Sequence, residues 1–254
     1  MVDRVAVLAD VHCVVPALAA VLAEPDVANA DVVVLAGDVT VGPQPERTID
    51  LITGLGERVL WVSGNCERET VGLARGTRTA DDPELAFAAW GAARLRPDQV
   101  DLLESLPKTA TLTIRGLGEV LFCHATPRDD EEFVLVDSTI ARWKAVLDGI
   151  PETVTTVVCG HTHMPFVRLV DRLVCVNPGS VGMPYGTSGA HWALLGGSDG
   201  PAIQLRRTRY DTGEAEHAIR AECDFPGIDE WITDYLRHQV SDVEALAVFG
   251  PRAT

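Results

Sequence analysis

The chain has 254 residues, enough for one large domain or two small ones with a substantial buried core. Its 37 acidic and 21 basic residues give a formal net charge of -16, which repels nucleic acids and anionic membranes unless a local positive site is present. We therefore expect no general nucleic-acid binding and no membrane association. Small anionic substrates are compatible with this charge only where the site itself supplies positive charge.

The six cysteines form no CxxC pair, and most of them lie in apolar runs. This usage suits a reducing compartment better than an oxidising one. The apolar stretch near the N-terminus is interrupted by Asp10 and His12, so it is too broken for an export signal. No run reaches the ~20 apolar residues that a membrane span needs. We predict a cytoplasmic protein.

The first elements of the chain are short apolar runs that end in small or polar residues, at 4–12, 31–39 and 58–65. Nearly continuous apolar strands are typical of a sheet that is covered on both faces. Helix-like segments at 16–24 and 45–55 separate the three runs. This order predicts parallel strands joined by crossover helices.

Residues 82–107 are rich in helix-forming side chains, and residues 109–125 are typical of a hairpin with its turn at 115–118. Further strands are predicted at 156–163, 166–170, 172–180, 191–197 and 202–210. The pattern predicts an α/β (α+β) fold of two mixed β-sheets packed face to face, with helices on the outer faces. We expect one domain over residues 1–254, with a C-terminal helical extension from about 213 to 254. Within this extension the apolar residues follow helical spacing, which predicts a helix that packs on one face: Ile228, Trp231, Ile232, Tyr235 and Leu236.

Side chains that can bind metals follow the predicted strands at the points where the strands end. They are Asp10, His12, Asp38, Asn65, His124, His161 and His163, whereas the other histidines, His191, His217 and His238, lie elsewhere. Ligands of α/β sheets bind beyond the carboxyl ends of the strands, so these side chains could converge. A turn explains each short motif alone equally well. Turns do not explain two carboxylates, one amide and four imidazoles that all follow strands.

Imidazole combined with carboxylate and carbonyl oxygen suits Mn, Fe, Zn, Co or Ni better than calcium. Seven protein ligands are too many for one such ion, but two ions that share a bridging carboxylate fit, as in two-metal phosphoryl and peptidyl hydrolysis. Two divalent ions bring four positive charges, and two carboxylates with a bridging hydroxide remove three, which leaves about +1. We therefore predict two divalent ions, with manganese favoured, and a small phosphorylated substrate.

The ordered series D-x-H, G-D, G-N, a lone histidine and G-H-x-H resembles the motifs of the calcineurin-like metallophosphoesterases. The stretches VNPGSVG and GHTHMPF are similar to the small bacterial and archaeal phosphodiesterase branch of that superfamily, and the resemblance runs over residues 5–195. It implies the two-sheet fold and an in-line attack of a metal-bound hydroxide on phosphorus, with Asp38, Asn65 and His124 in the catalytic set. It also implies two ions, the first held by Asp10, His12 and His163, the second by Asn65, His124 and His161, with Asp38 bridging them.

The chain departs from the family pattern at two places. Many members have a histidine after the metal-binding asparagine, where this chain has Cys66. A thiol is a poorer proton donor than that histidine and carries no positive charge. Two interpretations of Cys66 therefore stand side by side: a catalytic residue, or a small residue that packs. The family often has Gly-Asn after the first histidine, and here Cys13 and Val14 replace them. Changed surroundings of this kind can weaken metal binding about 10–100-fold.

Substrate binding is predicted for residues near the motifs: Arg68, Arg128 and Tyr185, with Glu67 a further candidate. An arginine can bind a phosphate oxygen bidentately, although each side chain could equally be a solvated surface group. Asn177 and Ser180 could brace the site or belong to a turn.

The sequence thus predicts a dinuclear metal-dependent phosphoesterase, with phosphodiesters or small nucleotides as substrates. The alternatives are a phosphomonoesterase or protein phosphatase, and a non-catalytic metal-binding interaction module like the retromer scaffold subunit. Because all seven ligand positions carry coordinating residues, the enzyme is favoured. A metallo-β-lactamase-type hydrolase would need an HxHxDH cluster, which the sequence lacks. The sequence is compatible with a monomer and with a homo-oligomer, since the C-terminal helix with Trp231 could cap its own domain or join a partner.

Overall fold

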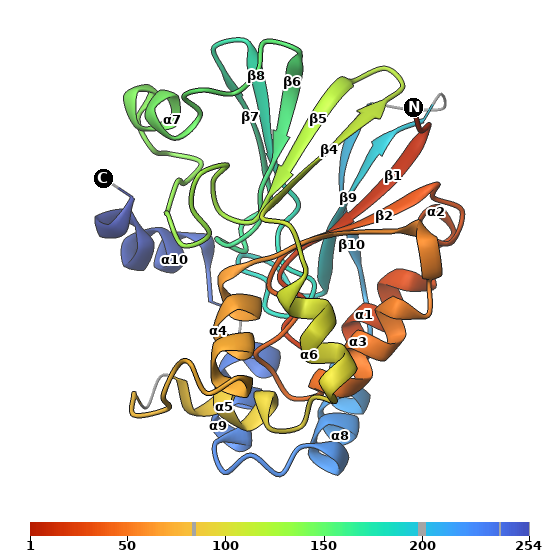
Figure 1. Ribbon diagram of the computed structural model, residues 1–254, viewed down its shortest axis with the longest axis vertical. Coiled ribbons are helices and arrows are strands. Elements are labelled where there is room, and N and C mark those ends of the chain that lie inside the picture. Colours follow the sequence, from red (N-terminus) through yellow and green to blue (C-terminus); the bar gives the residue numbers. More distant parts are fainter. Residues whose placement is uncertain (83–84, 198–201, 239, 254) are drawn as a thin grey trace.

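The computed structural model of the chain describes residues 1–82, 85–197, 202–238 and 240–253. Two five-stranded sheets lie face to face, and most helices gather beyond one end of them (Figure 1). Residues 83–84 of the predicted helical segment, and residues 239 and 254 of the predicted C-terminal extension, lie outside the described residues.

The first sheet has the strand order β10-β9-β1-β2-β3. Its strands are β1 (Arg4–Leu8), β2 (Val32–Ala36), β3 (Val59–Val62), β9 (Ala190–Gly196) and β10 (Ile203–Thr208). Strands β1, β2 and β3 are parallel, whereas β9 pairs antiparallel with β1 and with β10. Helices α1 (Val15–Leu22), α2 (Pro25–Ala28) and α3 (Pro45–Thr53), with the 3-10 turn η1 (Gly56–Arg58), connect the parallel strands. The predicted crossover pattern is confirmed.

The second sheet has the order β4-β5-β6-β8-β7 and is also mixed. Its strands are β4 (Thr109–Ile114), β5 (Gly118–Cys123), β6 (Val154–Val158), β7 (Phe166–Val170) and β8 (Leu173–Asn177). Strands β5, β6 and β8 are parallel, and β4 and β7 run antiparallel at the edges. Both sheets therefore direct several carboxyl ends toward the same region.

The alternation of side chains in each strand explains why the sheets stack. In β1, Val5 and Val7 belong to the core between the sheets, together with Phe122 of the second sheet. Ala6 and Leu8 point the other way, into the core under the helices. The predicted face-to-face packing of two mixed sheets is confirmed.

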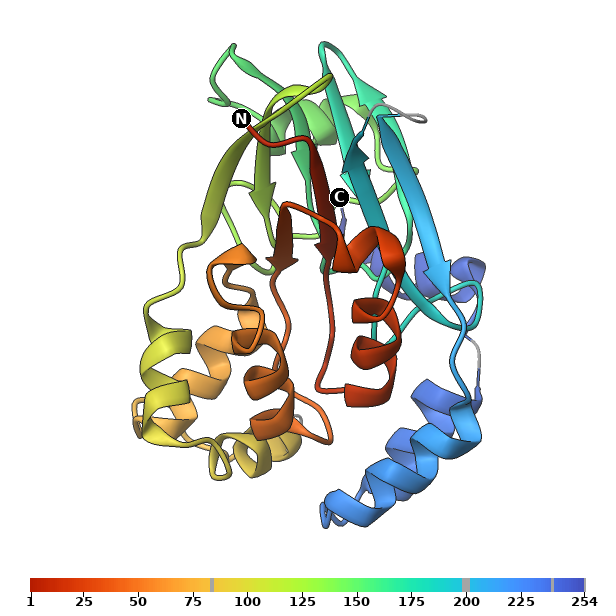
Figure 2. The same ribbon diagram turned by 90° about the vertical axis from the view of Figure 1, so that its right-hand side faces the viewer.

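Helices cover the outer faces of both sheets (Figure 2). Helices α1, α3, α8 (Thr212–Glu222) and α9 (Ile228–Ile232) contribute to the core on the first sheet. Helix α7 (Ile140–Val146), which the sequence analysis did not predict, covers the second sheet with Trp143 and Val146. Trp231 and Ile232 are buried in the core of their own chain, so the predicted terminal helix packs there.

The remaining helices differ from the prediction in detail. In the described part of the segment at 82–107 the predicted helical run is divided into α5 (Ala86–Ala92) and α6 (Pro97–Glu104), because Arg96 precedes a proline and is extended. Helix α4 (Asn65–Ala74) was not predicted. After α9 the chain continues through the π-helix η3 (Thr233–Arg237), α10 (Asp242–Phe249) and the 3-10 turn η4 (Gly250–Arg252). None of the described helices is long and apolar enough to cross a membrane.

Candidate metal centre

The loops that follow five strands meet at the carboxyl ends of the two sheets, and they carry all seven predicted ligands. Asp10 and His12 follow β1, and Asp38 follows β2. The remaining ligands follow β3, β5 and β6 and are Asn65, His124, His161 and His163. Five of the seven are buried, while Asn65 and His161 are partly exposed. The structure thus brings together residues that are far apart in the sequence.

One group consists of Asp10, His12 and His163, whose possible ligand atoms all lie within 4.8 Å of one another. His12 Nε2 and His163 Nε2 are 3.1 Å apart, and His163 Nε2 is 3.3 Å from Asp10 Oδ1. The backbone N–H of His161 donates to both carboxylate oxygens of Asp10 at 3.1 Å, which fixes the orientation of that carboxylate.

A second group consists of Asp38, His124 and His161. His124 Nε2 lies 3.2 Å from Asp38 Oδ2 and 3.2 Å from Asn65 Oδ1. Asp38 Oδ2 is also 3.9 Å from His12 Nε2, so this carboxylate lies between the two groups. The backbone N–H of Cys66 donates to the other oxygen, Asp38 Oδ1, at 2.9 Å.

The hydrogen-bond partner of the Nδ1 atom indicates the tautomer of His12, His124 and His163. The Nδ1 atoms of His12, His124 and His163 face the carbonyl oxygens of Val41, Ala36 and Met183 at 3.2, 2.9 and 2.8 Å. A carbonyl only accepts, so Nδ1 is the N–H donor and a neutral ring directs its Nε2 lone pair into the site. Lone pairs that face each other, and face carboxylates, repel unless a cation or proton lies between them. Ligating histidines typically have such a carbonyl partner, so the donor set fits divalent metal ions.

Burial and neighbouring charges lower the pKa of two of the four histidines and raise the pKa of the other two. Burial and the neighbouring His163 lower the pKa of His12, and burial with His124 lowers the pKa of His161 to about 4. Burial also acts to lower the pKa of His124 and His163, but a neighbouring carboxylate outweighs it in each case. Asp38 raises the pKa of His124 to about 10, and Asp10 raises the pKa of His163. Burial acts to raise the pKa of Asp38, and His124 outweighs it, so the pKa lies below the usual range. Metal ions would replace the protons at His124 and His163.

The backbone of the site is held in an uncommon conformation. Five of the seven predicted ligands have a positive φ, namely Asp10, His12, Asp38, His161 and His163, with angles from 45° to 64°. A non-glycine residue in a sparsely populated backbone region costs of order 1–3 kcal/mol and persists where the surrounding structure enforces it. Such strain is typical of functional sites.

The glycines of the G-N and G-H-x-H motifs permit the close approach of these loops. A Cβ on Gly64 would lie 2.3 Å from Asp38 Oδ1, and one on Gly160 would lie 2.7 Å from Asp10 Oδ2. Only a residue without a side chain fits at either position.

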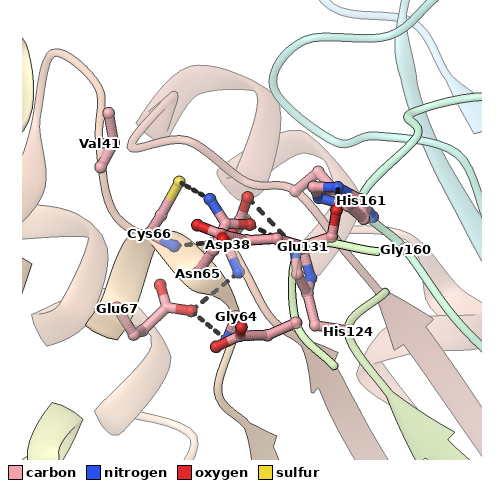
Figure 3. Close-up of polar contacts among 12 residues, drawn as sticks. Asp38, Val41, Gly64, Asn65, Cys66, Glu67, His124, Glu131, Gly160 and His161 are labelled. Carbon is pink, nitrogen blue, oxygen red and sulfur yellow. Dashed lines mark hydrogen bonds and ion pairs between the residues drawn. The ribbon is translucent and has the colours of Figure 1, made fainter. Parts of the chain in front are cut away.

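Glu67 is buried and braces the loop that carries Asp38 (Figure 3). Its carboxylate accepts hydrogen bonds from the backbone N–H groups of Asp38, Val39, Thr40 and Gly64 at 2.8–3.0 Å, and from the Thr40 hydroxyl. The sequence analysis considered Glu67 for substrate binding, and the structure instead gives it this bracing contact. The spacing G-x-x-E at a helix N-terminus is the sequence feature that could have indicated it.

Asn177 and Ser180 brace the opposite side of the site. Asn177 Nδ2 donates to the Gly160 carbonyl at 2.7 Å and to the Thr162 hydroxyl at 3.1 Å. The Ser180 hydroxyl donates to the Asp10 carbonyl at 2.7 Å. Both residues therefore hold loops that carry predicted ligands.

Cys66 is buried beside the site, close to His12 and Asp38. Its sulfur accepts from Asn65 Nδ2 at 3.7 Å. Burial, with Asp38, raises the pKa of the Cys66 thiol well above its usual value. The thiol therefore stays protonated and contacts a predicted ligand.

The predicted substrate-binding residues lie in different surroundings. Arg68 forms ion pairs with Asp130 and Glu131, both at 2.9 Å. Arg128 pairs with Glu132 and donates to the Ala145 carbonyl. Tyr185 is directly at the site, because its ring stacks on that of His163 with centroids 5.5 Å apart.

A cluster of buried aspartates and histidines at the carboxyl ends of two stacked sheets is the arrangement of a metal-binding hydrolase. The family model described as "Calcineurin-like phosphoesterase superfamily domain" matches residues 4–199. The chain belongs to the calcineurin-like phosphoesterase superfamily, as the motifs predicted.

Solved structures support the same fold. The metallophosphoesterase from Sphaerobacter thermophilus is 25% identical, with a TM-score of 0.70, over 91% of this chain and 98% of that one. The protein PH1004 from Pyrococcus horikoshii OT3 is 20% identical, with a TM-score of 0.77, over 93% of this chain and 99% of that one. A comparison with curated proteins finds no match.

Proposed function

We propose that the protein is a phosphodiesterase that works with two divalent metal ions. The observation that carries the proposal is the convergence of imidazole nitrogens and carboxylate oxygens from four loops, with the Nδ1–H groups of three rings, His12, His124 and His163, committed to backbone carbonyls. This donor set favours cations over protons. A phosphoester substrate follows from family membership.

The two groups of side chains described above suggest which residues would bind each ion. Asp10, His12 and His163 would hold the first ion, Asn65, His124 and His161 would hold the second, and Asp38 would be available to both. Two ions supply Lewis acidity and an activated water when they are bound. Carboxylate and carbonyl oxygens suit manganese, and imidazole suits zinc, iron and nickel, so the mixed donor set is compatible with each of these metals, and we take manganese as the ion to test.

This chain's own residues hold the catalytic set in place. Glu67 and the Cys66 N–H fix the loop and the carboxylate of Asp38. The Cys66 thiol accepts from the Asn65 amide nitrogen, which leaves Asn65 Oδ1 directed at the site. Cys66 thus orients a ligand in this proposal, and a substrate with a good leaving group needs no proton from it.

The cellular setting belongs to the same proposal. All six cysteines are free and buried, which supports a reducing compartment such as the cytoplasm. The substrate is a small phosphorylated molecule, because the site lies in a chain whose net charge of -16 repels polyanions.

The test compares hydrolysis of bis-p-nitrophenyl phosphate and p-nitrophenyl phosphate by the manganese-loaded protein. We expect a preference for the diester, and loss of both activities in Asp38→Asn. A preference for the monoester would support a phosphomonoesterase. Turnover that persists in Asp38→Asn, or no turnover despite two bound ions, would contradict the proposal and favour a binding module.

A further inference from the structure

His161 is held differently from the other three histidines of the candidate metal centre. Those three are buried and face backbone carbonyls through Nδ1. The His161 ring is partly exposed, and its Nε2 lies 3.2 Å from the Glu131 carbonyl oxygen. Because a carbonyl only accepts, Nε2 is the N–H donor in a neutral ring, and the lone pair is on Nδ1. The side chains that pack on this partly exposed ring therefore help to determine its orientation.

Phe133, two residues after Glu131, packs on the His161 ring. The two ring centroids are 4.5 Å apart, and Phe133 is buried. Phe249 stacks on Phe133 with centroids 5.0 Å apart and an angle of 20° between the rings. The Arg252 guanidinium lies 4.3 Å from the centroid of the same Phe133 ring. Stacked rings and a cation over a ring face both favour a defined geometry, so these two side chains restrict the movement of Phe133.

Both side chains belong to the C-terminal segment. Phe249 is the last residue of α10 and Arg252 is the last residue of η4, outside the residues that the family model matches, 4–199. Ala245 and Ala253 anchor this segment in a small core beside the loop between β5 and α7 (Figure 1). The segment thus gives the metal centre a support that the matched region does not contain.

Phe249 also approaches the second histidine of the G-H-x-H motif. Its ring lies 5.9 Å from that of Tyr185, which lies 5.5 Å from His163. The His163 ring, however, is buried, and its Nδ1–H donates to the Met183 carbonyl at 2.8 Å. Loss of the Phe249 ring should therefore disturb His161 more than His163.

We propose that Phe249 is a positioning residue that acts through Phe133 and holds the His161 ring in the orientation in which it binds the second ion. The inference rests on the proposed two-ion centre. Without the Phe249 ring, the Phe133 ring can turn away from His161, and the imidazole gains other orientations. Contacts that orient a metal ligand typically contribute 10–100-fold to metal affinity. The C-terminal segment thus supports one of the two ions selectively.

Calorimetric titration of the metal-free protein with manganese measures the affinity of each ion. We expect Phe249→Ala to weaken the second ion about tenfold and to leave the first unchanged. Phe249→Tyr keeps the ring and should retain both affinities. Phe249→Leu fills most of the same space without a ring, and it should give the same selective loss if Phe249→Ala does not fold.

Leu246→Ala is the matched packing control. Leu246 packs on the same small core from the same helix, but it has no ring to stack on Phe133. We expect this variant to melt at a lower temperature and to keep both manganese affinities. The comparison separates the stacked ring from a general loosening of α10.

Nitrogen–proton correlation spectra of the metal-free protein test the same contact without any metal. We expect the His161 ring to carry its proton on Nε2 in the wild type, because of the Glu131 carbonyl, and to populate both tautomers in Phe249→Ala. This readout concerns the orientation of one ring and does not depend on turnover.

A second-ion affinity that Phe249→Ala leaves unchanged overturns the inference, and so does an equal weakening in Phe249→Ala and Leu246→Ala. If the wild type binds two ions and neither affinity depends on Phe249, the proposed function stands and the positioning role fails. If the wild type binds fewer than two ions while the His161 tautomer depends on Phe249, the support of His161 stands and the proposed two-ion centre fails.

Discussion

Replacing Glu67 by glutamine tests whether a buried carboxylate holds the metal centre together. One carboxylate oxygen accepts from the N–H groups of Asp38 and Gly64, at 2.9 and 2.8 Å. The other accepts from Val39 and from two groups of Thr40. Glutamine has a single acceptor oxygen, so its NH2 group must face backbone N–H donors.

At least two buried N–H groups therefore lose their acceptor in Glu67→Gln. Each such loss costs about 1–3 kcal/mol, so we expect the free energy of unfolding to fall by about 3 kcal/mol. For a chain of this size this lowers Tm by about 6–12 °C. Because the loop that carries Asp38 loosens, we also expect weaker binding of manganese.

Thermal unfolding of the metal-free variant and calorimetric titration with manganese measure the two effects. Glu69→Gln is the matched control, since Glu69 lies on the same helix and forms an ion pair with Arg78 at 3.7 Å. If Glu67→Gln melts within about 1 °C of the wild type and binds manganese equally well, the bracing argument is wrong.

Three further predictions follow from other parts of the molecule. Asn177→Ala removes the hydrogen bond to the Gly160 carbonyl, so differential scanning fluorimetry should give a Tm lowered by about 4–8 °C; an unchanged Tm contradicts the bracing role. Gly160→Ala would place a Cβ 2.7 Å from Asp10 Oδ2, so we expect about tenfold weaker manganese binding in calorimetry, and equal affinity would refute the steric argument. Burial raises the pKa of Cys175 to about 12, against 9.0 for an ordinary thiol, so above pH 9.0 the unfolded chain releases a proton that the folded chain keeps. The free energy of unfolding from urea titrations should therefore fall between about pH 9 and 12, and fall less in Cys175→Ala.

Much of the fold could be predicted because the sheets are built from nearly continuous apolar strands with polar ends. In β1, the side chains of Val5 and Val7 enter one core and those of Ala6 and Leu8 enter the other. Strands that are joined by a crossover helix run parallel to each other, so the helical segments between the strands predict the strand direction. Helix α4 was missed because its first residues, Asn65 and Cys66, belong to a motif whose small and polar residues are typical of a turn.

The convergence of the seven candidate ligands could be predicted because their order along the chain carries the information. Their supporting contacts could not, because they join residues that are distant in sequence. The spacing G-x-x-E indicates the contact of Glu67 with the Gly64 N–H, but it does not indicate the contacts with Asp38, Val39 and Thr40, which are distant in sequence. The approach of Phe249 to Tyr185 depends on how the C-terminal segment packs, which periodicity alone does not determine.

The most direct test of the central claim is the number of manganese ions bound per chain, measured by elemental analysis after equilibration and gel filtration. The proposed centre predicts two ions in the wild type. It predicts at most one in Asp38→Asn, since this carboxylate lies 3.2 Å from His124 Nε2 and 3.9 Å from His12 Nε2, between the two groups. A wild-type protein that binds one ion or none, or an Asp38→Asn variant that still binds two, would contradict the dinuclear centre.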